Sequence, residues 1–75
     1  MSRIVGQPVA VVTNPQGAPC WTNGWEVLHV HSHHREWIGA LEGELERDVW
    51  KVETARGILE LHHVQGKWIL AKAED

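Results

Sequence analysis

The residues best suited to chemistry are histidines that alternate along one short segment. The chain has six histidines, and His29, His31 and His33 stand two residues apart, so in a β-strand they would share one face. Neutral imidazoles bind zinc, copper and nickel, and Glu36 or His62 could add a ligand. Same-face side chains of a flat strand lie ~7 Å apart, too far to chelate one ion without a bend. We therefore expect no cofactor, with zinc or another transition metal at the three histidines as the alternative.

Catalytic groups are sparse. An acidic cluster follows the histidines and comprises Glu42, Glu44, Glu46 and Asp48. Paired carboxylates can act in general acid–base catalysis, but the glycines in this segment favour a solvated loop over a buried pair. Histidine beside Cys20 or Ser32 could imitate a nucleophile and its base, yet the chain has no nucleophile elbow and no glycine-rich phosphate loop. We expect a protein that is not an enzyme.

Size and composition limit the alternatives. The 75 residues are 43% hydrophobic and 23% charged, which is typical of one folded domain spanning residues 1–75. The single cysteine excludes an internal disulfide. No apolar run approaches the ~20 residues of a membrane-spanning helix, and Met1–Gly6 lacks the apolar segment of a secretory signal. We therefore expect a cytoplasmic protein without a membrane partner.

Short β-strands are expected to position these residues. Runs rich in β-branched and aromatic residues alternate with turn signals such as Asn23-Gly24 and Gln65-Gly66. The expected strands are 8–13, 18–22, 25–32, 47–54, 58–64 and 67–71. Residues 33–45 contain two glycines and no clean period, so we expect a long loop with Trp37 packed on the body. Residues 1–6 and 72–75 are expected to be loosely ordered.

Strands of this number and length predict an all-β fold. The chain is too short for an immunoglobulin sandwich of ~100 residues, so we expect a small, five- to six-stranded, strongly bent antiparallel barrel of the Src-homology-3 type. Alternation predicts one set of inward-facing residues. These are Leu28, Val30, Trp50, Val52, Leu59, Leu61, Trp68 and Leu70. The chain has five tryptophans and no phenylalanine or tyrosine. Trp50 and Trp68 are expected to supply much of the core, because each ring can bury ~150–250 Å², whereas Trp21 is expected to cover an edge.

Motifs spread over nearly the whole chain carry a family resemblance. They are residues 7–11, Trp21, Gly24-Trp25, 27–30, Trp37, 46–54, Gly57, 59–61 and 68–70. In this order they resemble a small uncharacterised bacterial domain that occurs free-standing or as a tail on mutagenesis accessory proteins related to Y-family DNA polymerases. The resemblance implies an intracellular all-β domain with a link to DNA repair or replication, and it supplies no catalytic residues. Val49 stands where that family favours an aromatic residue.

Binding is the function that remains. A small barrel with an exposed edge and surface tryptophans suits a protein partner or a second copy of the chain. We expect the contact surface at Trp25, Trp37, Arg35 and Ile38. The alternative is a single-stranded nucleic acid whose bases stack on Trp25 and Trp37. Its phosphates would be held by Lys51, Arg56 and Lys67. The formal charge of −3 is unfavourable for that alternative.

Overall fold

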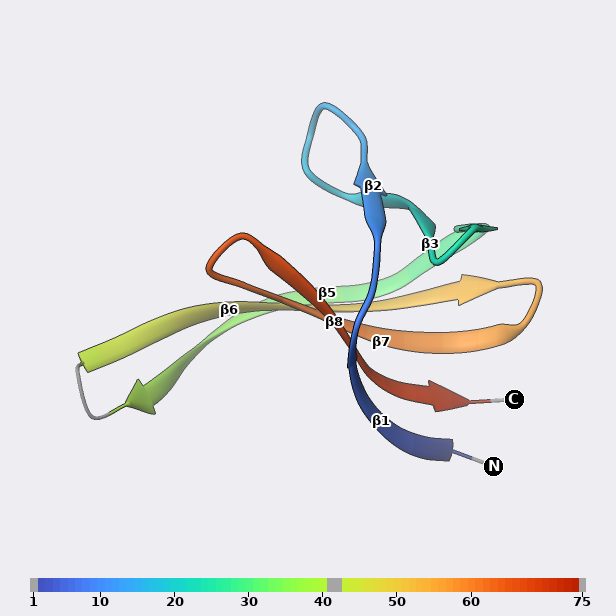
Figure 1. The fold of residues 1–75 in the computed structure, drawn as a ribbon. Helices are drawn as coiled ribbons and strands as arrows, with labels where there is room; N and C mark the ends of the chain where they lie inside the picture. The colour runs from blue at the N-terminus through green and yellow to red at the C-terminus, as the bar shows by residue number, and fades with distance from the viewer. Residues whose placement is uncertain (1, 41–42, 75) are drawn as a thin grey trace.

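Eight strands in two antiparallel sheets form the protein, as seen in a computed structural model that describes residues 2–40 and 43–74 (Figure 1). The strands are β1 Ser2–Pro8, β2 Val11–Thr13, β3 Pro19–Thr22, β4 Trp25–Glu26, β5 His29–Ala40, β6 Gly43–Thr54, β7 Gly57–Val64 and β8 Lys67–Glu74. The larger sheet has the order β1-β8-β7-β6-β5, and the smaller has the order β2-β3-β4. The expected all-β class is confirmed. In the described ranges, no helix has the length and apolarity needed to cross a membrane.

The expected closed barrel is not present. β1 and β5 are the two ends of the larger sheet, and no pairing of described residues joins them. Each of these strands contains a register shift, in β1 between Ile4 and Gln7 and in β5 between Val30 and Ser32. Such bulges bend and twist a strand. The larger sheet is therefore bent but open, and the smaller sheet lies against one of its faces.

Tight turns connect the strands where the sequence predicts them. Asn23 and Gly24 have φ values of 52° and 85°, and Gln65 and Gly66 have φ values of 51° and 76°. Two successive residues with positive φ suit the right-handed twist of a two-residue hairpin. Asn14 makes the β2–β3 connection differently, because its side-chain Oδ1 accepts hydrogen bonds from two backbone amides farther along the loop.

The core lies between the two sheets. Val52 and Leu61 are fully buried on the neighbouring strands β6 and β7, and Thr22 of β3, in the smaller sheet, is also buried. We call the face of the larger sheet that carries Val52 and Leu61 its inner face. Cross-strand register places Trp50, Leu61 and Leu70 in one inner row, and Val52, Leu59 and Ala73 in the next. Most of the predicted inward set is therefore on this face, with Trp50 and Trp68 half-buried.

Leu28 departs from the predicted core. It lies in the short connection between β4 and β5 and is exposed. A connection outside the sheet does not follow the alternation of a strand, so the assignment by alternation was wrong there. Val49 shows the converse, because it is buried on the outer face of β6.

The expected loop at 33–45 is instead most of a long hairpin. β5 and β6 pair from His29 with Glu53 to Ala40 with Gly43. Trp37 lies on a strand and is 62% exposed, so it is not packed on the body as expected. Residues 41 and 42 lie outside the described residues.

The two ends of the chain are also paired. Ser2–Pro8 forms β1 where a loosely ordered leader was expected, and β1 pairs with β8 from Ser2 with Glu74 to Pro8 with Ile69. Strand β8 continues to Glu74, beyond the expected end at residue 71. These pairings join residues about seventy positions apart, a relation that alternation within a segment does not reveal.

Candidate functional site

The end of the β5–β6 hairpin projects beyond the rest of the larger sheet (Figure 1). Strand β7 pairs with β6 only as far as Arg47, which lies opposite Val64. Residues 37–40 and 43–46 therefore pair only with each other, and we call these two segments the arm. Isolated two-stranded ribbons are marginally stable in water. The arm is thus presented to solvent on both faces.

Trp37 is the dominant side chain of the arm. It lies opposite Glu46, on the same face as Arg35, two residues earlier in β5. Ile38 lies on the other face, opposite Leu45, and both of these side chains are half-buried. Of the four residues predicted to form a contact surface, Trp37, Arg35 and Ile38 are therefore near one another, although Ile38 is on the opposite face of the ribbon.

Trp25 is distant from that group. It lies on β4 beside the β6–β7 turn, where Arg56 stands over its ring with the guanidinium carbon 5.4 Å from the ring centroid. Trp37 is on β5 and lies opposite Glu46, which is near the other end of β6. The intervening length of β6, from residue 46 to residue 54, spans about 26 Å at the usual rise of a strand. Trp25 and Trp37 thus belong to two separate surfaces.

An ionic network lies at the base of the arm. Arg35 Nε is 3.0 Å from Asp48 Oδ1 and 2.8 Å from Glu46 Oε1, and His33 Nε2 is 3.2 Å from the same Asp48 oxygen. Partial burial would raise the pKa of Asp48, but the hydrogen bonds from Arg35 and His33 together lower that pKa below its usual value. The hydrogen bond to Asp48 in turn raises the pKa of Arg35.

A second ion pair braces the outer face of the same region. Arg47 Nε donates a hydrogen bond to Glu36 Oε1 across the two strands at 2.8 Å. This hydrogen bond from Arg47 is the main reason that the pKa of Glu36 lies below its usual value. On each face of the hairpin, one arginine therefore links β5 to β6 through an ion pair, at the point where the arm leaves the sheet.

Two histidine–tryptophan stacks lie on the inner face next to Asp48. His33 stacks on Trp50 with ring centroids 3.7 Å apart, and His63 stacks on Trp68 with centroids 4.3 Å apart. Both stacks are cross-strand pairs, and His63 is also the register partner of Asp48. No role of His63 was predicted from the sequence, because its position next to Asp48 follows from strand register.

The predicted metal residues are divided between two faces. The bulge at Val30/Ser32 interrupts the alternation of β5, so His33 lies on the inner face against Trp50. His29 and His31 remain together with ring centroids 4.9 Å apart, and His31 Nε2 is 2.9 Å from Glu53 Oε1. The prediction that one face carries all three was therefore wrong. Within residues 2–40 and 43–74, no three His, Cys, Asp or Glu side chains form a group able to hold a metal ion.

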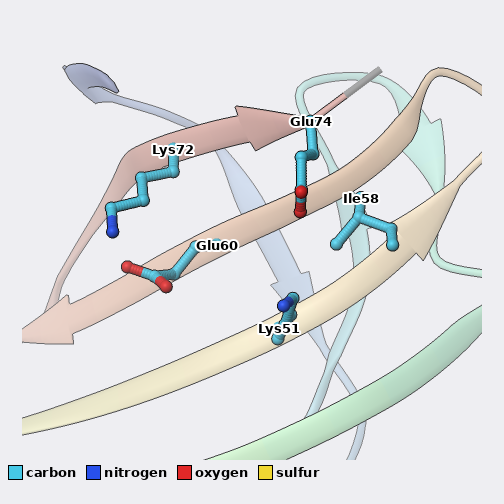
Figure 2. A pocket seen from close by; sticks show the side chains of 5 residues that line it. All are labelled: Lys51, Ile58, Glu60, Lys72 and Glu74. Atoms are coloured by element: carbon cyan, nitrogen blue, oxygen red, sulfur yellow. The ribbon is translucent and has the colours of Figure 1, made fainter. Parts of the chain in front are cut away.

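The predicted nucleic-acid residues are also dispersed. Lys51 is on the outer face of β6, opposite Glu60, whereas Lys67 begins β8 opposite Val64 at the other end of the sheet. Arg56 is in the β6–β7 turn against Trp25. Figure 2 shows Lys51 beside Ile58, Glu60, Lys72 and Glu74 in an outer-face hollow of about 220 Å³. Two lysines and two glutamates line this hollow, so its charges cancel.

The comparisons with known proteins give no relative for this chain. No protein-family model matches it, and neither a curated protein nor a solved structure matches it.

Proposed function

We propose that the protein is a non-enzymatic interaction module whose arm binds an extended, basic segment of a partner protein. The observation that carries the proposal is Trp37, which is 62% exposed on a ribbon that projects from the sheet. Exposed tryptophans are frequent energetic centres of protein interfaces. The arm presents this ring away from the core, so a partner could cover it without rearranging the fold.

The backbone of β5 supports the same proposal. β5 is the last strand in the order of the larger sheet, so the described residues place no strand on its outer side. Residues 37–40 of this strand contain no proline, no charged residue and no bulge, the features that protect sheet edges from pairing. An extended segment of a partner could add to this edge through main-chain hydrogen bonds, and its side chains would contact those of the arm.

The charge of the arm face favours a basic partner. Glu44, Glu46 and Asp48 alternate along β6 and so share the Trp37 face, where Arg35 is the cation. Among the described residues of this face, three carboxylates and one guanidinium give a net charge of −2 with histidine neutral. Lysine or arginine of the partner would meet these carboxylates and could also lie over the indole, a cation–π contact of ~0.5–1 kcal/mol at an exposed site. A phosphate backbone would be repelled.

A labelled ten-residue peptide that alternates lysine and threonine tests the proposal by fluorescence anisotropy. We expect binding that Trp37→Ala weakens about tenfold, the equivalent of ~1.4 kcal/mol. Trp21→Ala is the matched control, since Trp21 is 47% exposed on β3 of the smaller sheet, and it should leave the affinity unchanged. A peptide that alternates glutamate and threonine should not bind.

Equal effects of the two tryptophan substitutions, or equal binding of the two peptides, would remove the basis of the proposal. A homodimer built through the same edge is the competing outcome. Light scattering on the purified chain would reveal it as a doubled mass that Trp37→Ala returns to that of a monomer.

The remaining expectations form part of this proposal. The motif resemblance described above supports a bacterial cytoplasmic setting near DNA repair or replication. The bulged β1 and β5 support a relation to Src-homology-3-like folds, because bulges are the usual means of bending small sheets.

A further inference from the structure

A pocket of about 220 Å³ lies between the two sheets, at the end of the molecule opposite the arm. Its lining comes from β1, the β3–β4 hairpin, β7, β8 and the β6–β7 turn. Leu59 and Leu70 form an apolar part of the wall, and Arg3, Arg56, Thr22 and Trp25 supply the polar and aromatic parts. The pocket is independent of the arm.

Thr22 is a buried polar residue in the wall of the pocket. The residue is 1% exposed, and its hydroxyl Oγ1 is buried without a hydrogen-bond partner among the described residues. A buried hydroxyl left unpaired costs about 1–3 kcal/mol. Valine would have nearly the same shape without that cost.

Two arginines indicate that the pocket would take an anionic ligand. Arg3 and Arg56 both line the pocket, and no carboxylate is among its described lining residues. Their combined charge of +2 matches a phosphate monoester, which carries about −1.5 to −2 at neutral pH. Guanidinium groups also bind phosphate oxygens through paired hydrogen bonds. A singly charged carboxylate would leave part of this charge uncompensated.

Trp25 and the leucines define the rest of the ligand. The indole lines the pocket with Arg56 over its ring, and the leucines add an apolar wall. This surface suits a planar organic group attached to the phosphate. We propose that the pocket binds a nucleotide through its phosphate, either free or as the 5′-phosphorylated end of a single nucleic-acid strand.

Calorimetric titration of the full chain with adenosine 5′-monophosphate tests this proposal. We expect binding, with adenosine alone and inorganic phosphate each at least tenfold weaker. Arg56→Gln should weaken the nucleotide at least tenfold. Lys72→Gln is the matched control, because Lys72 lines the charge-balanced outer hollow of similar volume (Figure 2), and it should change the affinity less than twofold.

Urea unfolding of the Arg56→Gln variant keeps the test independent of misfolding. This variant should be about as stable to urea as the parent, because Arg56 is exposed in the β6–β7 turn, yet it should bind the nucleotide more weakly. No binding at millimolar nucleotide, or equal losses in the Arg56 and Lys72 variants, would overturn the proposal.

A 5′-phosphorylated oligothymidine distinguishes the two sources of the phosphate. Affinity more than tenfold above that of thymidine 5′-monophosphate identifies a strand end as the ligand, and equal affinity identifies the free nucleotide. An oligothymidine without the 5′-phosphate that binds as tightly as the phosphorylated one would contradict the proposal.

Discussion

Replacing Leu61 by alanine tests where the stability of this small protein resides. Leu61 is fully buried on β7, with Trp50 beside it on β6 and Leu70 beside it on β8. The substitution removes three carbons, a transfer loss of ~2.4 kcal/mol at ~0.8 kcal/mol each. The cavity left behind raises the expected loss to about 3–4 kcal/mol. A chain of 75 residues has a total stability of roughly 4–11 kcal/mol, so this one change should remove a large share of it.

The measurement is urea unfolding followed by tryptophan fluorescence, with Ile38→Ala as the comparison. Ile38 is a half-buried aliphatic residue of the arm that lies opposite Leu45 alone, so its loss should reduce the unfolding free energy by less than about 1 kcal/mol. Leu61→Val provides a milder core variant, expected near 1 kcal/mol, if the alanine variant does not fold. A loss below about 1 kcal/mol for Leu61→Ala, or an equal loss for Ile38→Ala, would refute the placement of the core between the sheets.

Two further predictions concern the base of the arm and the last turn. The pKa of Asp48 lies below its usual value of 3.8, so its contribution to stability is present above that value and is lost as the pH falls through the lower folded-state pKa. Asp48→Asn should therefore reduce the fall in urea midpoint between about pH 5 and pH 2, and an unchanged fall would show that other carboxylates cause it. Gln65 has a φ of 51°, so Gln65→Gly should raise the unfolding free energy by about 0.5–1 kcal/mol, and a lower urea midpoint would contradict this.

Alternation of apolar and polar residues, together with turn dipeptides, predicted the strands that have one more buried face and one more exposed face. Strands β6 and β7 were expected from the alternation around Val52 and Leu61, and Asn23-Gly24 and Gln65-Gly66 marked two of the turns. A half-buried sheet produces such alternation because one face must be apolar. Prediction was therefore most successful where the two faces of a strand meet different environments.

The arm lacks that signal for a physical reason. In the described part of the chain, no other sheet covers either face of the arm, so adjacent Trp37 and Ile38 are tolerated on opposite faces and no alternation develops. The histidine prediction failed because of one residue, since the bulge at Val30/Ser32 moves His33 to the inner face. A bulge depends on the bending of the whole sheet, which the spacing of histidines does not encode.

The nucleotide pocket was only partly foreseeable. Trp25 and Arg56 were both part of the nucleic-acid alternative predicted from the sequence, Trp25 as a stacking ring and Arg56 as a cation, but each was grouped with residues that lie elsewhere in the fold. Their contact depends on the β3–β4 hairpin reaching the β6–β7 turn, and the addition of Arg3 depends on the β1–β8 pairing. The contacts between these segments, which are distant in sequence, bring the pocket residues together, and local patterns along the chain do not reveal them.

The pairing of β1 with β8 sets how this unit can be joined to other proteins. Ser2 lies opposite Glu74, so the first and last described residues lie side by side, while the arm points to the other side of the molecule (Figure 1). A host protein could therefore carry the unit as a tail, as a head or as an insertion between two of its own residues without covering Trp37. The host would emerge close to Arg3 and the pocket between the sheets. Fusion would thus leave one surface facing outward and place the other against the body of the host.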